Sequence, residues 1–369
     1  MRKDKIISLV FVGILLAGFL WNILTPVRAY SERENRYLQG RPTLSMDRVL
    51  SGQFGKDFET YTTDQFPMRD AWVSLKTMAG LAMLRPDNGR VYFGKQHRLF
   101  EIPEPADAAL QEKNCLAVAG FLEKVTREYP EIRASVLLAP TATTVLEGAL
   151  PACAPVADEA GLILRQRRAL GESVVFCDPT PALLGQLDRE SLYYRTDHHW
   201  TSLGAYYAYC AWRGIQPNAD EWTQEILCGN FRGTTWNKVP LPTVPAEEIA
   251  AWYKHINRSV SYNNGQYETD SIYERKYLSG SDQYAVFLNS NQAQTVIEGS
   301  GKSGKLLLIK DSYGNTFSQS PVEDYAEVHV LDLRFFKGDA VDYAKENGIT
   351  DALVLYGVQN FVKDTNLRF

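Results

Sequence analysis

The chain contains 369 residues, a length that suits one large domain or two medium ones, and 45% of them are hydrophobic and 22% charged. This composition supports a sizeable core and excludes a chain that is disordered as a whole. The formal net charge of −5, with no long basic run beyond the N-terminus, excludes a general affinity for nucleic acid, so we expect no nucleic-acid partner.

The N-terminal segment is predicted to enter a membrane. Residues 6–24 carry no charge, and as a helix rising about 1.5 Å per residue they would span roughly 28 Å. The basic residues Arg2, Lys3 and Lys5 precede this run, which predicts a cytoplasmic N-terminus and an extracytoplasmic remainder. We expect residues 1–29 to be retained as a single-pass anchor in the cell membrane. The alternative is a signal peptide cleaved near residues 27–29, followed by secretion.

The five cysteines are odd in number and show no CxxC or metal-like spacing. An extracytoplasmic location would permit a disulfide, but most of these cysteines lie in apolar patterns that are typical of buried thiols. We therefore expect free cysteines and no zinc site at Cys115, Cys153, Cys177, Cys210 and Cys228.

Residues 30–88 are predicted to form a polar, partly ordered spacer (30–42) followed by two amphipathic helices, with a break at residues 66–69. The pattern of residues 89–101 predicts a β-hairpin that begins the main domain, 89–369. Helical patterns then alternate with buried-strand patterns. The strands are expected at 134–139, 174–176, 306–309, 328–331 and 352–356, and helices at 110–129, 160–170, 203–211 and 340–346.

This alternation predicts an α/β fold in which a parallel sheet is flanked by helices. The alternation of strands and helices is interrupted at about residues 215–304 by an irregular, turn-rich and aromatic stretch. We interpret this stretch as a lid or an insertion between core elements. Its aromatic rings either stack on sugar rings or pack in the interior; the sequence leaves both interpretations open.

Two distant segments carry residues suited to nucleophilic catalysis. Ser312 follows the apolar run 306–309 at a turn, where its hydroxyl would be exposed and backbone N–H groups could stabilise an oxyanion. In an extended segment, residues two apart face the same side, so Asp197 and His199 would project together while His198 points away. These residues predict Ser312 as nucleophile, His199 as base and Asp197 as the residue that orients the base.

Two other interpretations of these residues stay open. In the first, Asp197 and Ser312 cap helices and the histidines pack in the core. In the second, Asp197 binds a metal together with His198 or His199, although no further ligand cluster accompanies them. The prediction for the site is therefore a triad without a metal.

Asp197-His198-His199-Trp200 resembles the motif of the DHHW family of exported bacterial proteins. Other segments resemble that family in the same order: Glu34-Asn35-Arg36, Asp64-Gln65-Phe66-Pro67-Met68-Arg69, Val91-Tyr92-Phe93-Gly94-Lys95, Asp311-Ser312-Tyr313-Gly314-Asn315 and Gln359-Asn360-Phe361. The family is similar to the SGNH-like domains of alginate O-acetylation proteins, in which an Asp-x-His-Trp element precedes the nucleophilic serine. The resemblance implies an SGNH-hydrolase-like fold and the same triad, Asp197, His199 and Ser312.

The resemblance implies O-acetylation of a secreted or cell-wall polysaccharide through an acyl-serine, with a membrane-bound O-acyltransferase as donor partner and no cofactor or metal. An acetylesterase with the same triad and a non-catalytic polysaccharide-binding or assembly protein are the alternatives. We assign substrate or oxyanion contacts to Thr141, Gln359 and Asn360 and substrate contact to Tyr313. A hydroxyl-rich turn is the alternative for Thr141. Arg195 or Arg334 would meet an acidic sugar, with a surface ion pair as the alternative.

Overall fold

A computed structural model describes residues 2–31, 36–105 and 107–369 and divides the chain into two units. The first unit comprises Met1–Asn88 with Asn237–Pro242, and the second comprises Gly89–Trp236 with Thr243–Phe369. The residues of the predicted catalytic site all lie in the second unit.

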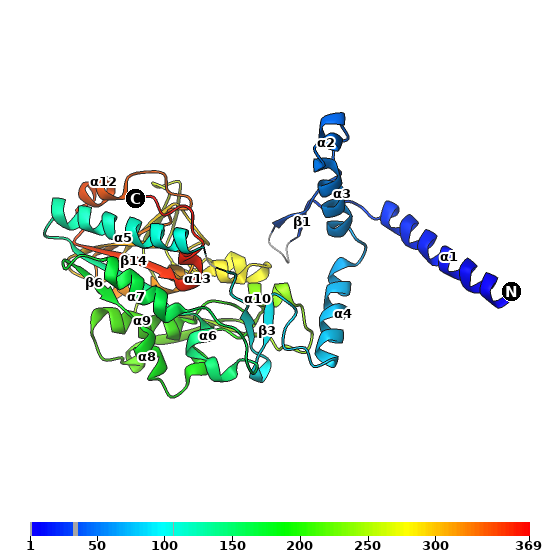
Figure 1. The fold of residues 1–369 in the computed structure, drawn as a ribbon. Coiled ribbons are helices and arrows are strands. Elements are labelled where there is room, and N and C mark those ends of the chain that lie inside the picture. Colours follow the sequence, from blue (N-terminus) through cyan, green and yellow to red (C-terminus); the bar gives the residue numbers. More distant parts are fainter. Residues whose placement is uncertain (1, 32–35, 106) are drawn as a thin grey trace. The chain divides into compact units, whose positions relative to one another are not determined.

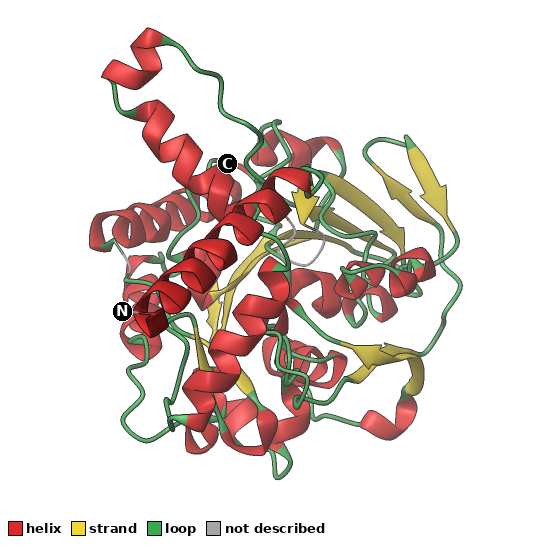
Figure 2. Ribbon diagram, turned by 90° about the vertical axis from the view of Figure 1, so that its right-hand side faces the viewer, coloured by secondary structure: helices red, strands yellow, loops and turns green. Residues whose placement is uncertain are grey.

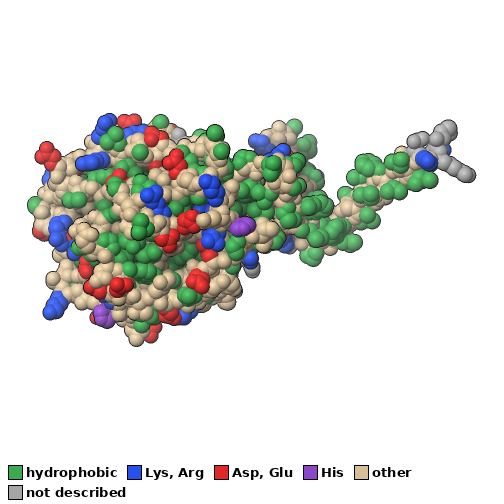
Figure 3. Space-filling view, turned by 90° about the horizontal axis from the view of Figure 1, so that it is seen from below, with side chains coloured by type: hydrophobic (Ala, Val, Ile, Leu, Met, Phe, Trp, Pro, Cys, Tyr) green, Lys and Arg blue, Asp and Glu red, His purple; other side chains and the backbone are tan. Residues whose placement is uncertain are grey.

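Helix α1 (Arg2–Leu24) confirms the expected apolar helix near the N-terminus. Its segment Lys5–Leu24 is long and apolar enough to cross a membrane, by length and composition, and none of it is buried. Figure 3 shows hydrophobic side chains gathered along this helix. Its retention as an anchor and its cleavage as a signal sequence remain two predictions.

The segment predicted as a polar, partly ordered spacer is hydrogen-bonded to one of the helices that follow it. Strand β1 (Tyr30–Ser31) pairs with β2 (Arg36–Tyr37), and helices α2 (Met46–Leu50), α3 (Gln53–Asp64) and α4 (Arg69–Ala82) come next. The Arg36 guanidinium donates to both oxygens of Asp64 at the end of α3, at 2.6 and 3.0 Å. Two of the motif segments therefore meet here, although Glu34-Asn35 lies outside the described residues.

The second unit is built on one eight-stranded sheet, in the order β10-β9-β11-β13-β12-β14-β5-β6. The five strands from β13 to β6 are parallel to one another, whereas β11 is antiparallel to β13, β9 to β11 and β10 to β9. This confirms a mixed α/β fold with a mostly parallel sheet. The strand bounds are β5 Arg133–Ala139, β6 Val174–Cys177, β9 Val260–Tyr262, β10 Tyr267–Thr269, β11 Gln294–Glu298, β12 Lys305–Lys310, β13 Glu327–Leu331 and β14 Asp351–Gly357.

Helices cover both faces of the sheet (Figures 1 and 2). Leu307 and Ile309 of β12 pack in one core cluster and Leu306 and Leu308 in the other, because successive side chains of a strand point to opposite faces. The first cluster contains side chains of α5 (Ala108–Glu128), α7 (Glu159–Ala169), α12 (Ala340–Glu346) and α13 (Val358–Phe361). The second contains side chains of α6 (Ala142–Val145), α8 (Thr180–Leu184), α9 (Ser202–Arg213) and α11 (Tyr313–Phe317).

Besides the main sheet, the described part of the second unit contains two antiparallel pairs. The predicted hairpin is present as β3 (Val91–Phe93) and β4 (Leu99–Glu101), and β7 (Thr223–Phe231) pairs with β8 (Glu247–Tyr253). The short helix α10 (Thr234–Lys238) follows β7.

The region that we interpreted as a lid or insertion is partly a continuation of the sheet. Its strands β9, β10 and β11 extend the sheet beyond β13, which the irregular pattern did not predict. Most of its large aromatic side chains are buried in the core, while Tyr267 is 41% exposed. Interior packing therefore accounts for Trp252, Tyr262, Tyr273 and Tyr284.

All five cysteines are free. Cys115, Cys177 and Cys210 are buried, as expected, whereas Cys153 is exposed and Cys228 is half-buried. Burial raises the pKa of Cys115 to about 11 and that of Cys177 to about 12, so these two thiols stay protonated at neutral pH.

Candidate active site

The loop that carries Asp197 and His199 is anchored along its length. Tyr193 and Trp200 form an antiparallel bridge at its ends, and the indole Nε1 of Trp200 donates to the Tyr313 carbonyl at 3.1 Å. The carboxylate of Glu247 accepts the backbone N–H groups of Arg195 and Thr196 at 2.7 and 2.6 Å. The conformation of the loop is therefore fixed by contacts to other parts of the fold rather than by regular secondary structure of its own.

The structure brings the three predicted catalytic residues into one chain of contacts. His199 Nε2 lies 2.7 Å from Ser312 Oγ, and His199 Nδ1 lies 2.5 Å from Asp197 Oδ1. Ser312 is at the start of α11 but its side chain makes no capping bond, and α9 is capped by Thr201. The capping interpretation therefore does not describe these side chains, and their catalytic roles remain predictions.

The electrostatics of the site favour a neutral His199 beside an ionised Asp197. Burial lowers the pKa of His199 to about 4, and the nearby His198 acts in the same direction, although Asp197 opposes them. Burial acts to raise the pKa of Asp197, but the two histidines and the hydrogen bond from the Thr234 backbone hold it below its usual value. Since Asp197 accepts at His199 Nδ1, Nε2 is left unprotonated and faces Ser312 as an acceptor.

The turn at Ser312 is fixed by the buried carboxylate of Asp311. Asp311 accepts hydrogen bonds from the backbone N–H groups of Tyr313 and Gly357, both at 3.0 Å, and from Asn360 Nδ2 at 2.7 Å. The Gly314 N–H bonds the Asp311 carbonyl. Of the turn's first three N–H groups, that of Ser312 alone has no hydrogen-bond partner among the described residues, so it is the one available to an oxyanion.

His198 does not point away from the site, contrary to our expectation. Its ring centroid lies 3.8 Å from that of His199, and its Nδ1 lies 2.9 Å from Thr234 Oγ1. The reason is local. Asp197 Oδ1 accepts the backbone N–H of His199 at 3.0 Å, which bends the segment, so the alternation of an extended strand does not apply.

Tyr284 is a residue of the site that the sequence did not reveal. Its ring stacks on that of His199, with centroids 4.0 Å apart and an interplanar angle of 7°. Its hydroxyl lies 2.5 Å from Thr316 Oγ1 and 3.2 Å from the Ser312 carbonyl oxygen. Tyr284 thus contacts both the ring of His199 and the backbone of Ser312. In the sequence it is one aromatic residue among many in the irregular region.

Two predicted substrate contacts make their hydrogen bonds elsewhere. Thr141 is buried, and both its N–H and its hydroxyl donate to Glu159, at 3.0 and 2.5 Å. Arg334 donates to both oxygens of the buried Asp332, at 2.8 and 2.5 Å. These contacts fit the structural alternatives, a hydroxyl-rich turn and an ion pair. Substrate binding by either residue remains a prediction.

The other predicted contacts lie around the turn. Tyr313 is buried, and its hydroxyl donates to the His198 carbonyl at 2.7 Å, so it supports the histidine loop. Asn360 holds Asp311. Gln359 lines a pocket of about 420 Å³ together with Val358 at the end of β14. Of the predicted contacts, Gln359 is therefore placed at a cavity, while Tyr313 and Asn360 support the turn and the loop.

Asp197, His198 and His199 also offer potential metal-ligand atoms within 4.8 Å of one another. However, both oxygens of Asp197 and both ring nitrogens of His199 already have hydrogen-bond partners in the protein. A metal ion would have to displace these contacts, so the donor set fits the triad better than a metal site.

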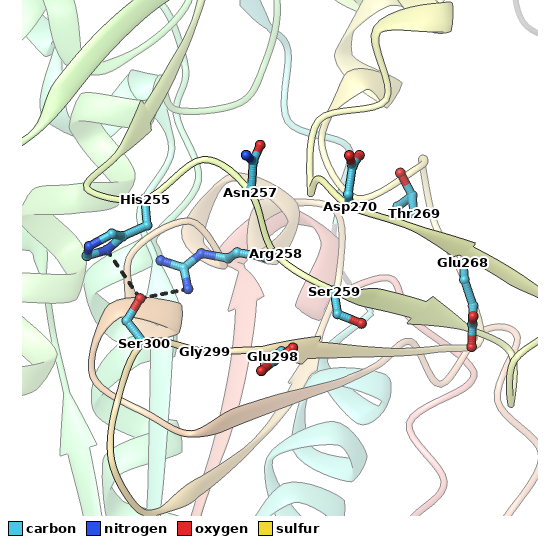
Figure 4. A pocket seen from close by; sticks show the side chains of 10 residues that line it. All are labelled: His255, Asn257, Arg258, Ser259, Glu268, Thr269, Asp270, Glu298, Gly299 and Ser300. Carbon is cyan, nitrogen blue, oxygen red and sulfur yellow. Dashed lines mark hydrogen bonds between the residues drawn. The ribbon is translucent and has the colours of Figure 1, made fainter.

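A second serine–histidine pair, Ser300 and His255, lines a separate pocket of about 700 Å³ (Figure 4). Ser300 Oγ lies 3.2 Å from His255 Nδ1, but Glu323 Oε2 lies 2.9 Å from the same nitrogen, and Arg258 donates to Ser300. A base must accept on one nitrogen while the acid holds the other. Because Nδ1 serves both partners here, this cluster cannot activate its serine in the way that His199 can.

The comparisons with known proteins agree with the resemblance seen in the sequence. Residues 167–331, which contain the triad, match the family model described as DHHW protein. The chain is similar in structure to a DHHW family protein from Eubacterium siraeum, with 23% identity, coverage of 75% of this chain and 96% of that one, and a TM-score of 0.63. These matches confirm the expected resemblance to the DHHW family.

Other solved structures are more distant in sequence. Bacillus cereus PatB1 with a sulfonyl adduct is 16% identical, with coverage of 76% of this chain and 97% of that one, and a TM-score of 0.62. The O-acetyltransferase domain of Pseudomonas putida AlgJ is 16% identical over 74% of this chain and 93% of that one, with a TM-score of 0.46. No curated protein matches the chain.

Proposed function

We propose that this chain, which matches the DHHW family model over residues 167–331, is an acyltransferase that O-acetylates a polysaccharide through an ester on Ser312. The observation that carries the proposal is the continuous contact from Asp197 through His199 to Ser312, at 2.5 and 2.7 Å. A protein that only binds polysaccharide has no need for a serine hydroxyl within hydrogen-bonding distance of an unprotonated imidazole nitrogen.

In the first half-reaction, Ser312 Oγ attacks the carbonyl carbon of the acyl donor while His199 Nε2 takes its proton. Asp197 stabilises the imidazolium that forms. The Ser312 N–H donates to the developing oxyanion. When the bond to the leaving group breaks, His199 returns the proton to that group, and the acetyl ester of Ser312 remains.

In the second half-reaction, a sugar hydroxyl gives its proton to His199 Nε2 and attacks the ester. The acetyl group passes to the sugar, and Ser312 Oγ recovers the proton. Water in place of the sugar would make the enzyme an esterase, so the two activities differ only in the acceptor that reaches the acyl-enzyme.

The proposed setting is the extracytoplasmic face of the cell membrane. Helix α1 is long and apolar enough to hold the chain there, and a membrane-bound O-acyltransferase is the proposed donor partner. The chemistry of the triad needs no metal or organic cofactor.

The test uses the full-length protein in detergent, with p-nitrophenyl acetate as donor. We expect wild type to release nitrophenol and to carry an acetyl group on Ser312 by mass spectrometry, and Ser312→Ala and His199→Ala to do neither. Ser300→Ala is the matched control, because Ser300 also contacts a histidine but lacks a free base. Equal activity in Ser312→Ala and wild type would refute the triad. Adding oligosaccharides then distinguishes transfer from hydrolysis.

A sulfonyl fluoride gives a second readout. Such reagents sulfonylate activated serine hydroxyls, and one PatB1 structure contains a sulfonyl adduct. We expect phenylmethylsulfonyl fluoride to modify Ser312 in wild type and to leave Ser312 unmodified in His199→Ala. This readout does not depend on finding the natural donor.

A further inference from the structure

His198 is connected to the triad through a threonine. Thr234, the first residue of α10, donates both its backbone N–H and its hydroxyl to Asp197 Oδ2, at 2.7 and 2.9 Å. The same hydroxyl oxygen lies 2.9 Å from His198 Nδ1. The three side chains thus form a second arm on Asp197, opposite to the arm that runs through His199 to Ser312.

The direction of the hydrogen bonds in this arm follows from counting protons. A threonine hydroxyl has one proton, and Thr234 gives it to Asp197, which is ionised and can only accept. Thr234 Oγ1 can therefore only accept from His198, so His198 Nδ1 must carry a proton. Glu101 Oε1, at 3.7 Å from the same nitrogen, also favours a proton there.

We propose that His198 is a positioning residue: its Nδ1–H orients the Thr234 hydroxyl onto Asp197 Oδ2 and thereby keeps Asp197 Oδ1 on His199. The inference rests on the proposed function, because it concerns the base of that reaction. It explains why His198 lies against His199 instead of pointing away.

The surroundings of His198 are consistent with a fixed ring. Its side chain is 26% exposed, its ring contacts His199, and its carbonyl accepts from the Tyr313 hydroxyl. The charged and titratable groups that face it are Glu101, Asp197, His199 and Tyr313. A side chain that merely filled space here would not need a donor at the position of Nδ1.

The first test compares replacements that keep or remove that donor. The amide nitrogen of asparagine can occupy the position of Nδ1, so we expect His198→Asn to recover most of the rate of Ser312 sulfonylation that His198→Ala loses. The expected loss in His198→Ala is about 2- to 10-fold, the range for a hydrogen bond between neutral groups, because the Thr234 hydroxyl that His198 contacts is uncharged. A His198→Asn protein as slow as His198→Ala would overturn the proposal.

The second test is a double-mutant cycle with Thr234→Val, which removes the hydroxyl and keeps the shape. If His198 acts through Thr234, the double variant His198→Ala/Thr234→Val will be no slower than Thr234→Val alone. Rate losses that multiply would show that His198 acts by another route, and would overturn the proposal.

The third test does not require activity. In ¹⁵N-histidine-labelled full-length protein, NMR correlations identify which ring nitrogen carries the proton. We expect the Nδ1–H form for His198, which the Ser312→Ala variant should retain, whereas an Nε2–H form would overturn the proposal. If wild type showed this form and Ser312 were never acylated, the proposed function would fail while the assignment of His198 would stand.

Discussion

Replacing Asp197 by asparagine is the change that most directly tests how the site works. Asp197 accepts from the backbone N–H and Nδ1 of His199 at Oδ1, and from the N–H and hydroxyl of Thr234 at Oδ2. An asparagine has one acceptor oxygen and one NH₂ group of similar shape. In either orientation its NH₂ group therefore faces a buried backbone N–H that loses its acceptor.

The size of the effect follows from these contacts. With the NH₂ group toward His199, Nδ1 must become an acceptor, so the proton moves to Nε2 and the imidazole can no longer accept from Ser312. The corresponding replacement in the serine-protease triad lowers kcat about 10⁴-fold. We expect Ser312 acylation to fall about 10³- to 10⁴-fold. The unsatisfied N–H should lower the free energy of unfolding by about 1–3 kcal/mol.

The assay measures the rate of Ser312 sulfonylation by mass spectrometry and the unfolding free energy by denaturant titration. Asp220→Asn is the matched control, because Asp220 is exposed and the same chemical change there should alter neither quantity. An Asp197→Asn protein that is sulfonylated within about threefold of the wild-type rate would refute the assignment of Asp197 as the residue that orients His199.

Three further outcomes are expected. Tyr284→Ala should slow Ser312 sulfonylation up to about 10-fold because the ring stacked on His199 is lost, whereas Tyr284→Phe keeps the ring and should stay within about threefold of wild type. Equal sulfonylation rates in the two variants would contradict this role of the ring. Since the reaction needs neutral His199, whose pKa is lowered to about 4, the rate of sulfonylation should be level above about pH 6 and decline through about pH 4; a midpoint at the ordinary histidine pKa, about 6.5, would contradict this. Asp311→Asn should lower the free energy of unfolding by about 1–3 kcal/mol, because both carboxylate oxygens accept N–H groups; stability as high as that of Asp220→Asn, measured by denaturant titration, would count against it.

The central part of the fold was predictable because its signal is strong. Residues 306–309 and 352–356 are continuous apolar runs, and the structure buries them on both faces as β12 and β14. The helix expected at 340–346 is present with those bounds, capped by Asp339. Long buried strands and capped helices could therefore be predicted from the local pattern of apolar and capping residues.

The edge of the sheet was not predictable in the same way. β9 and β10 have three residues each and join at a turn that contains Asn263 and Asn264 with positive φ. Such short strands carry too little alternation to be separated from loops. Pairing with β11 and then β13, which only the tertiary structure supplies, defines them.

In the candidate site too, some residues could be predicted from the local sequence and others depend on the tertiary structure. Asp197, His199 and Ser312 were found because they lie in local patterns of recognisable chemistry. Thr234 and Tyr284 contact those residues from other segments, and no pattern in the sequence joins them. The predicted orientation of His198 was wrong because the backbone N–H of His199 donates to the side chain of Asp197, and this hydrogen bond bends the segment.

Ser312 and His199, the proposed nucleophile and base, come from segments that are 113 positions apart, and β14, which pairs beside β12, comes later still in the chain. Until the two segments come together, Ser312 has no histidine beside it and its hydroxyl is an ordinary one. On the proposed mechanism, reactivity at Ser312 thus requires that these distant segments have packed together. A pulse of sulfonyl fluoride during refolding should therefore label only the molecules in which Ser312 and His199 are already in contact. The fraction of labelled protein at each time would then report how far this part of the fold has assembled.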